Sequence, residues 1–312
     1  MQTCMQYRVV AADASSAQRQ LLWDLCYRVT GTVEDADTLV RDWLARAVER
    51  SPSDREADPR AHLVRSVATP AVEALRTRKR RRYTGSWLPA PVETGNAASA
   101  GPRDDAGSGM RYDMVESGSM AFLKALEALD PRERIVFVLA DALGFQPQAT
   151  ATALDLTSAT VRTVLLNARR KMKAYDSTHV PPTSDVQAHT MDCLRDCLWH
   201  LQRLDAGRLE KTLAVDAQAL FDSSGEFVAP PGSVFGAATI AKLLTKFVEG
   251  TGPISLAYRM LNGMPAAVAQ SPGRPRWAKR MVIRVELRED LVTEVHVIMA
   301  TAKLAAVRFD PI

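Results

Sequence analysis

Two clusters of cations are the residues whose types and spacing point most directly to chemistry. Arg76-Thr-Arg-Lys-Arg-Arg-Arg82 has six cations in seven residues, and Arg169-Arg-Lys-Met-Lys173 closes a second helical stretch. Clustered cations on helices are typical of proteins that bind a polyanion, most often nucleic acid. For either cluster alone, a solvated helix end is the alternative, since cations there also suit the helix dipole. Two clusters, each closing a helical module, favour nucleic acid.

A helix-turn-helix is predicted over residues 130–173. Asp130-Pro131 is expected to cap its first helix, residues 146–154 form a short second helix, and Asp155-Leu156 makes a tight turn. Thr157 or Ser158 then caps a third helix, whose N-terminal residues would enter the major groove of DNA. The apolar residues of this third helix recur at helical spacing and should face inward: Val161, Leu165, Ala168 and Met172.

The opposite side of the third helix carries the residues that we expect to contact DNA. Arg162 and Thr163 are placed to reach base edges, whereas the cations further along the helix suit phosphates. The predicted set is Ser158, Thr160, Arg162, Thr163, Asn167, Arg169, Arg170 and Lys171. An ordinary helical hairpin is the alternative that spacing alone leaves open.

Two histidines and two cysteines form a second constellation that could do chemistry. His189, Cys193, Cys197 and His200 are residue types that bind zinc. One straight helix would spread them over about 16 Å, whereas a tetrahedral zinc ion needs all its ligands within about 2.3 Å of itself. We therefore interpret them as one face of a core helix, and we predict no metal and no cofactor.

The elements that must position these residues fall into more than one domain, because 312 residues exceed a single ordinary core. Helical periodicity predicts three helices in the first module, with a break at Gly31, a cap at Thr32 and a helix start at Pro59. A stretch rich in Gly, Ser, Ala and Pro follows and is interpreted as a flexible linker. The predicted organisation is 15–82 helical, 83–118 linker, 119–175 helix-turn-helix, 176–186 linker and 187–312 α+β.

The last part of the chain is predicted to be an α+β domain. Helices are expected near 187–204, 207–214 and 236–249, followed by an antiparallel sheet. The predicted strands are Ile254–Leu261, Ala266–Gln270, Arg280–Arg288 and Val292–Met299. In the last strand His296 and Ile298 share one face, while Val295 and Val297 share the other. A lone histidine in a strand is more often structural than catalytic.

The sequence lacks two kinds of membrane signal. There is no run of about 18 uninterrupted apolar residues and no basic head followed by an apolar stretch at the N-terminus. We therefore expect a cytoplasmic protein with no membrane partner. In a reducing cytoplasm the four cysteines are expected to be free thiols.

The chain resembles the sigma-70 family of transcription initiation factors. Leu129-Asp-Pro-Arg-Glu-Arg134, with Gly144-Phe145 and residues 157–173, is similar to region 4 of that family. Gly31-Thr-Val-Glu-Asp-Ala-Asp-Thr-Leu-Val40 and Asp58-Pro-Arg-Ala-His-Leu63 are similar to region 2. Two modules without a third between them resemble the extracytoplasmic-function (ECF) group. Tyr83-Thr-Gly-Ser-Trp-Leu-Pro-Ala-Pro91 resembles the motif of the subgroup with a SnoaL-like C-terminal domain, and Asn262-Gly263, Pro265-Ala266 and Lys303-Leu304 also fit it.

The resemblance implies partners and roles. Region 2 would dock on the RNA polymerase core and open the −10 promoter element, region 4 would bind the −35 element, and neither is an enzyme. The implied polymerase-binding residues are Asp35, Asp37, Arg41 and Asp42. Those implied to meet −10 DNA, beside the loop 51–59, are Arg65, Thr69, Arg76, Arg78 and Lys79. The C-terminal domain would be a regulatory, cone-shaped α+β fold around a pocket, with an unidentified small ligand.

The chain departs from the family pattern at several positions. An acid is expected at Thr38, glutamine at Arg41, and asparagine at Pro70, where a proline should bend the helix near Ser66. Tryptophan is expected at His62, an acidic pair at Gln148-Ala149, and glycine at Asp155. In the C-terminal domain the glycines after Asp222 are replaced except Gly225, and Ala300-Thr-Ala302 stands where Asn-Pro-Asp is usual.

These departures keep two alternatives open. One is a helix-turn-helix regulator that binds DNA without polymerase. The other is an enzyme that uses His296 or Asp222 in the pocket.

Overall fold

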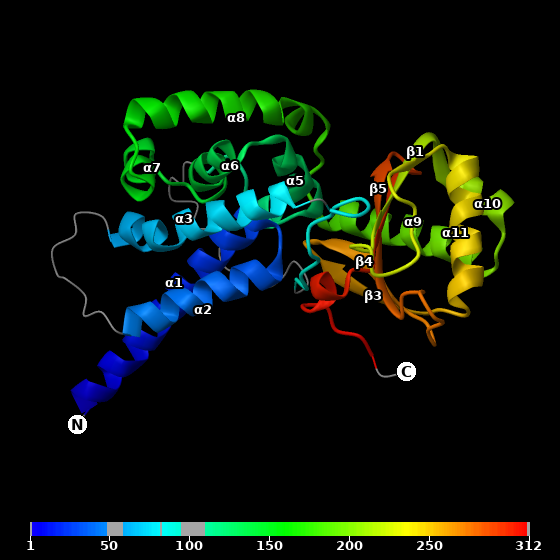
Figure 1. Ribbon diagram of the computed structural model, residues 1–312, viewed down its shortest axis with the longest axis horizontal. Helices are drawn as coiled ribbons and strands as arrows, with labels where there is room; N and C mark the ends of the chain where they lie inside the picture. The colour runs from blue at the N-terminus through cyan, green and yellow to red at the C-terminus, as the bar shows by residue number, and fades with distance from the viewer. Residues whose placement is uncertain (1, 49–58, 82, 95–109, 311–312) are drawn as a thin grey trace. The chain divides into compact units, whose positions relative to one another are not determined.

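The computed structural model describes residues 2–48, 59–81, 83–94 and 110–310. The chain divides into two compact units (Figure 1): Met1–Arg81 with Asp104–His179, and Arg82–Arg103 with Val180–Ile312. The first unit is helical and the second is a six-stranded sheet with helices. The predicted fold class, helical modules followed by an α+β domain, is confirmed. None of the described helices is long and apolar enough to span a bilayer.

Three long helices open the first unit: α1 (Gln2–Thr30), α2 (Val33–Val48) and α3 (Pro59–Arg80). The predicted break at Gly31 is confirmed, because this glycine has a left-handed φ of 77° that ends α1. Thr32 caps α2 as predicted, since its Oγ1 accepts a hydrogen bond from the Asp35 amide at 3.3 Å. The helix α3 runs through Pro70 without ending there.

The rest of the first unit is built from short helices that support one long helix. These are α4 (Met114–Ser117), α5 (Met120–Ala125), η2 (Leu126–Ala128), α6 (Pro131–Phe137), η3 (Val138–Ala142), α7 (Pro147–Leu154) and α8 (Ser158–Thr178). The predicted cap at Asp130-Pro131 is confirmed. Asp130 accepts from the Glu133 amide while Glu133 accepts from the Asp130 amide, which is a capping box.

A buried arginine ties the two halves of the first unit together. Arg134 is fully buried, donates from Nε to the Arg28 carbonyl at 3.0 Å and pairs with Glu127. Arg78 also pairs with Glu127, at 2.6 Å. Burial alone would raise the pKa of the Glu127 carboxyl, but the charges of Arg134 and Arg78 hold this pKa below its ordinary value. The end of α3 is therefore locked to η2 by shared charge.

The second unit is a mixed sheet with three helices. Its helices are α9 (Ser184–Gln202), α10 (Ala206–Thr212) and α11 (Ala237–Thr251), with a final short turn η4 (Thr301–Leu304). Its strands are β1 (Leu213–Asp222), β2 (Val234–Phe235), β3 (Ser255–Leu261), β4 (Met264–Gln270), β5 (Arg280–Arg288) and β6 (Leu291–Ile298). They lie in the order β2-β1-β6-β5-β4-β3.

The four predicted strands, now β3 to β6, pair antiparallel as predicted, but the sheet also contains β1, which pairs with β6 in parallel. The last four strands match the predicted ones, but β1 and β2 were not predicted. The first residues of β1 fall in the helix predicted at 207–214, and their parallel partner lies about 75 residues further along the chain. Parallel pairing through a long crossover has no local sequence signature.

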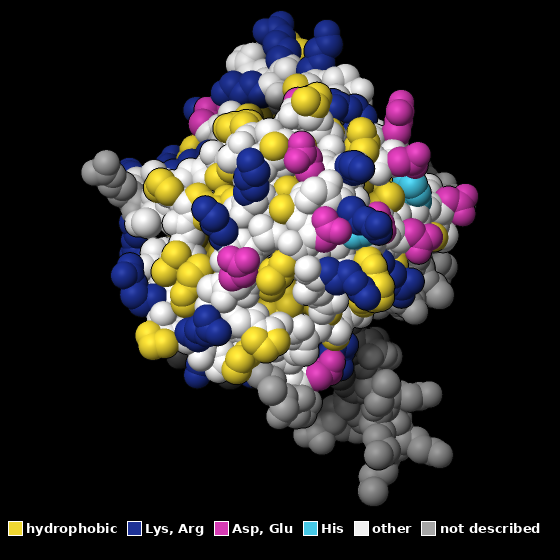
Figure 2. All heavy atoms as spheres, turned by 90° about the vertical axis from the view of Figure 1, so that its right-hand side faces the viewer, with side chains coloured by type: hydrophobic (Ala, Val, Ile, Leu, Met, Phe, Trp, Pro, Cys, Tyr) yellow, Lys and Arg dark blue, Asp and Glu magenta, His cyan; other side chains and the backbone are white. Residues whose placement is uncertain are grey.

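Apolar side chains fill the space between the sheet and its helices. Phe221 and Phe247 lie with ring centroids 5.8 Å apart, and Trp277 packs edge-on to Phe247 at 5.2 Å. Val295 and Val297 face this core, as predicted from the alternation in β6. On the face in Figure 2, apolar side chains are interspersed with charges of both signs.

The segment 83–94, which was interpreted as flexible linker, packs on the sheet unit. Leu88 is fully buried and Ala90 is 1% exposed. The amide of Asn262 donates to the Val92 carbonyl at 2.9 Å, and Glu93 forms an isolated bridge with Leu261 at the edge of β3. Of the rest of the predicted linker, residues 95–109 lie outside the described residues, and Met114–Ser117 form the helix α4 instead.

Candidate functional site

The helix-turn-helix is formed by α7, a tight turn and α8. Asp155 takes the left-handed conformation, with φ 56° and ψ 48°, at the position where the family pattern has glycine. Thr157, one of the two predicted caps, accepts from the Thr160 amide at 3.1 Å. Ser158 donates to Gln148 of α7 at 2.5 Å, so its hydroxyl closes the turn. The predicted inward stripe is confirmed: Val161, Leu165, Ala168 and Met172 are buried.

Two of the cations predicted to contact DNA pair with acids of the same unit. Arg169 donates from Nε and Nη2 to the two carboxylate oxygens of Asp141, at 2.9 and 2.6 Å. Asp141 is 1% exposed, and the hydrogen bonds to its carboxylate, together with its charge, raise the pKa of the Arg169 guanidinium. Lys171 pairs with Glu133 at 2.6 Å. These contacts hold α8 against α6 and η3, so the two side chains position the helix.

The outer side of α8 keeps the other predicted residues in solvent. Arg162, Thr163, Asn167 and Arg170 are exposed. Arginine can donate two hydrogen bonds to guanine or to a phosphate, and asparagine can pair with adenine. An exposed polar face beside a buried stripe, behind a capped N-terminus, is the arrangement that enters a major groove.

The cations of α3 also fall into two groups, those that pair within the unit and those that face solvent. Arg78 pairs with Glu127, and Lys79 donates to the carbonyls of Glu127 and Leu129 at 3.1 and 2.7 Å. Burial lowers the pKa of Lys79. Both side chains therefore brace the unit. Three other predicted residues face solvent: Thr69 is exposed, Arg76 is about half exposed beside Glu73, and Arg65 lies 3.7 Å from Asp155. The loop 51–58 lies outside the described residues.

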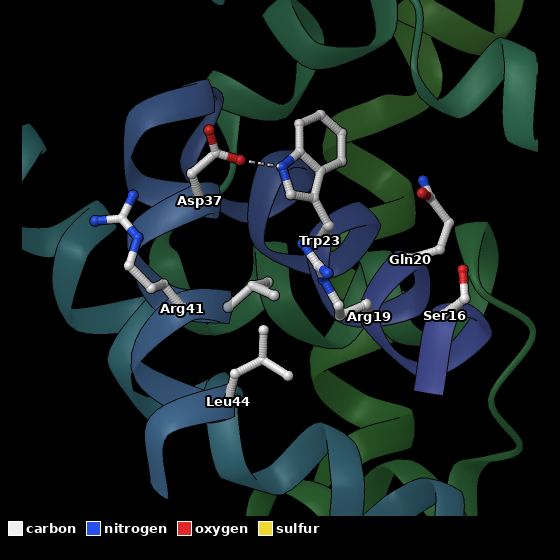
Figure 3. A pocket seen from close by; sticks show the side chains of 8 residues that line it. Ser16, Arg19, Gln20, Trp23, Asp37, Arg41 and Leu44 are labelled. Atoms are coloured by element: carbon white, nitrogen blue, oxygen red, sulfur yellow. Dashed lines mark hydrogen bonds between the residues drawn. The ribbon is translucent and has the colours of Figure 1, made fainter. Parts of the chain in front are cut away.

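A groove of about 590 Å³ lies between α1 and α2, on the helix predicted to dock polymerase (Figure 3). Trp23 donates from Nε1 to Asp37 at 2.8 Å across this groove. Val40 and Leu44 give it apolar walls, and two arginines line it, so the lining is Ser16, Arg19, Gln20, Trp23, Asp37, Val40, Arg41 and Leu44. The lining is therefore mixed: three apolar or aromatic side chains lie beside two cations and three other polar side chains.

The four predicted docking residues have different surroundings. Arg41 and Asp42 are exposed, and Asp37 accepts from Trp23. Asp35 accepts from the Thr32 hydroxyl at 2.6 Å, so it serves the cap of α2. The contribution of α1 to the groove, above all Trp23, was missed from the sequence. An aromatic residue with a polar edge at a helix surface was the available signal.

A buried ion pair fastens the segment 83–94 to the sheet. Asp222, at the end of β1, is fully buried, and Lys303 of η4 reaches its carboxylate at 2.5 Å. The Leu88 amide donates to the same carboxylate at 2.7 Å, and the Tyr83 hydroxyl donates as well. Lys303 Nζ also lies 4.5 Å from the Trp87 ring. We call this group, Tyr83, Trp87, Leu88, Asp222 and Lys303, the segment clip.

Asp222, one of the two residues that an enzyme would use in the pocket, is part of the segment clip. All the described partners of Asp222 are donors from the chain itself, so its carboxylate is committed to structure. His296 is fully buried on β6, with Nε2 2.7 Å from Glu294. In the paired strands, His296 lies opposite Leu220 and Ile298 lies opposite Asp222.

The histidine and cysteine residues of α9 do not converge. Cys197 is buried in the core of the second unit, and burial raises the pKa of its thiol to about 12. Cys193 lies toward the β5–β6 turn, with Sγ 3.8 Å from His189, and His200 lies 3.5 Å from Asp196. Within the described part of the chain, no group of three or more metal-binding side chains comes together.

Comparison with known proteins shows which proteins the chain resembles. Residues 119–172 match the family described as Sigma-70, region 4. The ECF RNA polymerase sigma factor SigJ of Mycobacterium tuberculosis is 29% identical over 243 residues, which span 76% of this chain and 73% of SigJ. Over three quarters of its length the chain is thus similar to an ECF sigma factor, and residues 119–172 match sigma-70 region 4. The sigma factor SigG of the same organism is 28% identical over 287 residues, 82% of this chain and 72% of SigG.

The similarity in fold extends to the sheet unit. The crystal structure of the M. tuberculosis extracytoplasmic function sigma factor SigJ matches 96% of this chain and all of that chain, with 24% identity and a TM-score of 0.67. The helix α7 and most of α8 lie within the residues that match sigma-70 region 4.

Proposed function

We propose that the chain is an RNA polymerase sigma factor that directs the core enzyme to specific promoters. The observation that carries the proposal is that one chain combines a grooved three-helix module with a capped, cation-faced helix-turn-helix, in the order found in the sigma factors it resembles. A regulator that binds DNA without polymerase would need the helix-turn-helix but not the grooved three-helix module.

Polymerase docking is assigned to the groove between α1 and α2. Arg41 lines the groove and is exposed, Asp42 is exposed on the same helix, and Trp23 and Leu44 supply apolar surface that a helical partner would cover. Asp35 supports the site through the cap of α2. The chemistry of the groove fits an acidic amphipathic helix of the polymerase core.

Promoter contact is assigned to the solvent-facing residues of α8 and α3. Arg162, Thr163, Asn167 and Arg170 would meet the −35 element, while Arg65, Thr69 and Arg76 would meet −10 DNA. The remaining residues of the predicted sets hold the helices in place, so their loss would weaken binding through the fold: Ser158, Thr160, Arg169, Lys171, Arg78 and Lys79.

Regulation is assigned to the sheet unit through the segment clip. The clipped segment follows α3 directly, so any change that opens the Asp222–Lys303 pair would free the chain that joins region 2 to region 4. A small ligand inside the cone would have to displace the packed rings of Phe221 and Phe247. Regulation through the segment clip requires a change in the contacts of Asp222 and Lys303 and no chemical reaction in this unit.

The test is transcription from a template library. Full-length protein is added to bacterial core polymerase on templates whose upstream 50 base pairs are randomised, and the RNA 5′ ends are sequenced. The proposal expects transcripts that start at a fixed distance from two enriched upstream motifs. Transcripts equal in number and start site to those from core polymerase alone would refute it. An unchanged transcript pattern accompanied by gel retardation of the templates would instead favour the polymerase-independent regulator.

A further inference from the structure

A third cluster of cations lies in the sheet unit, in the connection between β4 and β5. Arg274-Pro-Arg-Trp-Ala-Lys-Arg280 has four cations and no acid in seven residues. We call these residues the basic loop. All four cations are exposed, and the proposed function gives them no role. Like charges gathered at one place raise the local potential, which attracts a partner of opposite charge.

The charges of the basic loop are not neutralised by the described part of the chain. Arg274 donates from Nη1 to a backbone carbonyl of α11 at 3.2 Å, and Arg280 lies over the Phe309 ring at 5.0 Å. The side chains of Arg276 and Lys279 form no hydrogen bond or ion pair with any described residue. The basic loop therefore presents its full charge to a partner.

The backbone of the basic loop is held in one conformation. The amide of Ser271 donates to the Lys279 carbonyl at 2.9 Å, at the base of the loop. The carbonyl of Arg276, a residue with a left-handed φ of 68°, accepts from the Val228 amide at 2.9 Å. The ring of Trp277 packs against α11. Because the loop is already ordered, binding a partner costs little backbone entropy.

The composition of the basic loop fits a polyphosphate better than a protein. Protein interfaces depend on aromatic or apolar anchors at their centre, whereas Trp277, the aromatic residue of the loop, packs inward. Three of the four cations are arginines, which bind phosphate through two hydrogen bonds. Duplex DNA carries one charge per about 1.7 Å of its axis. Only residues 179–183 separate α8 from α9, so a duplex held by α8 is at a high effective concentration for the sheet unit.

We propose that the basic loop binds the phosphates of duplex DNA, so that the sheet unit adds a backbone contact to those assigned to α3 and α8. This inference goes beyond the proposed function and rests on it only in placing α8 on a duplex; it needs no polymerase. Phosphates are the same in every base sequence, so the basic loop raises affinity without selecting a promoter.

The test measures binding of the full-length protein to a labelled duplex of unrelated sequence, by fluorescence anisotropy at several salt concentrations and without polymerase. Arg276→Gln with Lys279→Gln, the loop variant, removes two cations whose side chains have no partner among the described residues, so the fold loses no contact of theirs. Arg208→Gln with Lys211→Gln removes the same charges from exposed positions of α10 and is the matched control. A parallel titration replaces the duplex by poly-L-glutamate.

We expect the loop variant to depend less on salt than the wild type. The logarithm of the binding constant falls with the logarithm of the salt concentration, with a slope of about 0.9 for each phosphate contact. Two lost contacts reduce this slope by about 1.8, so the affinity lost between about 50 and 200 mM salt should be roughly twelvefold smaller than for the wild type. The control should keep the slope of the wild type.

Equal slopes for the loop variant and the wild type, or an equal decrease in the control, would overturn the inference. Weaker binding of poly-L-glutamate by the loop variant, with unchanged binding of the duplex, would overturn it as well, because the partner would then be an acidic protein. Failure of the wild type to bind the duplex would also overturn it, whereas the proposed function is refuted only by the transcription experiment.

Discussion

Opening the segment clip is the perturbation whose consequence can be worked out most fully from the structure. Lys303→Met keeps the length and apolar stem of the side chain but removes its charge. The partner carboxylate of Asp222 is 0% exposed, and the Lys303 side chain is 8% exposed. Removing one partner of a buried pair costs about 3–5 kcal/mol, because the other charge stays buried without compensation.

The local effect is best measured by hydrogen exchange. The Leu88 amide donates to Asp222 at 2.7 Å, so it reports the state of the clip directly. If exchange proceeds through local opening, a loss of about 3 kcal/mol accelerates it roughly a hundredfold. We expect this acceleration in peptides covering residues 83–94 for Lys303→Met. Lys242→Met, which changes an exposed lysine on α11, should leave these peptides unchanged.

A second variant separates charge from packing. Asp222→Asn combined with Lys303→Met removes both charges, so less of the segment should open than in Lys303→Met alone. The reasoning would be refuted if exchange over residues 83–94 stayed within about threefold of the wild type in Lys303→Met, because a cost of 3 kcal/mol or more cannot give so small a change.

Two further predictions concern stability. Burial, helped by the nearby charge of Asp113, raises the pKa of Glu116 to about 7, so the folded state holds a proton that the unfolded state releases above about 4.5. Thermal unfolding should therefore show stability falling as the pH rises from about 4.5 to 7, and Glu116→Gln should flatten this fall; an equally steep fall in the variant would contradict the assignment. Gly250→Ala should destabilise the sheet unit by about 1–3 kcal/mol in urea unfolding, since an added Cβ would lie 2.2 Å from the Trp277 ring. Gly232→Ala, where nothing lies within 4 Å, is its control, and equal stability of the two variants would count against the packing argument.

Features that depend on neighbouring residues could be predicted from the sequence. The capping box of Asp130 and Glu133 and the cap at Thr32 each involve residues three apart, and the inward stripe of α8 follows from helical spacing alone. The last four strands could be predicted for the same reason, because the alternation of apolar and polar residues along a strand involves only neighbouring residues.

Features that depend on distant partners could not be predicted. The sequence predicts Arg78 to contact DNA because it lies in a cluster of cations. Nothing in such a cluster distinguishes a cation that binds DNA from one that pairs within the fold, and the partner of Arg78, Glu127, is 49 residues away. The segment 83–94 was interpreted as flexible because Asp222, which holds Leu88, is 134 residues away. The strand β1 was missed because it is completed by parallel pairing with β6.

The division of roles within the predicted sites follows from these distant contacts. Of the predicted DNA-binding cations, Arg78, Lys79, Arg169 and Lys171 have acidic or carbonyl partners in their own unit, whereas Arg162 and Arg170 are the exposed cations of α8 that we propose for DNA contact. Asp35 and Arg41 differ in the same way, because Asp35 accepts a hydrogen bond from the capping residue Thr32, whereas Arg41 faces solvent on the groove.

The most direct test of the central claim is binding of the full-length protein to bacterial core RNA polymerase, measured by co-elution at near-physiological salt. Arg41→Glu reverses a charge on the groove between α1 and α2, and Arg132→Glu makes the same change at an exposed position on α6. The account predicts that the wild type and Arg132→Glu co-elute with the core enzyme and that Arg41→Glu binds at least tenfold more weakly. Absence of co-elution for the wild type, or equal binding by all three proteins, would contradict polymerase docking through this groove.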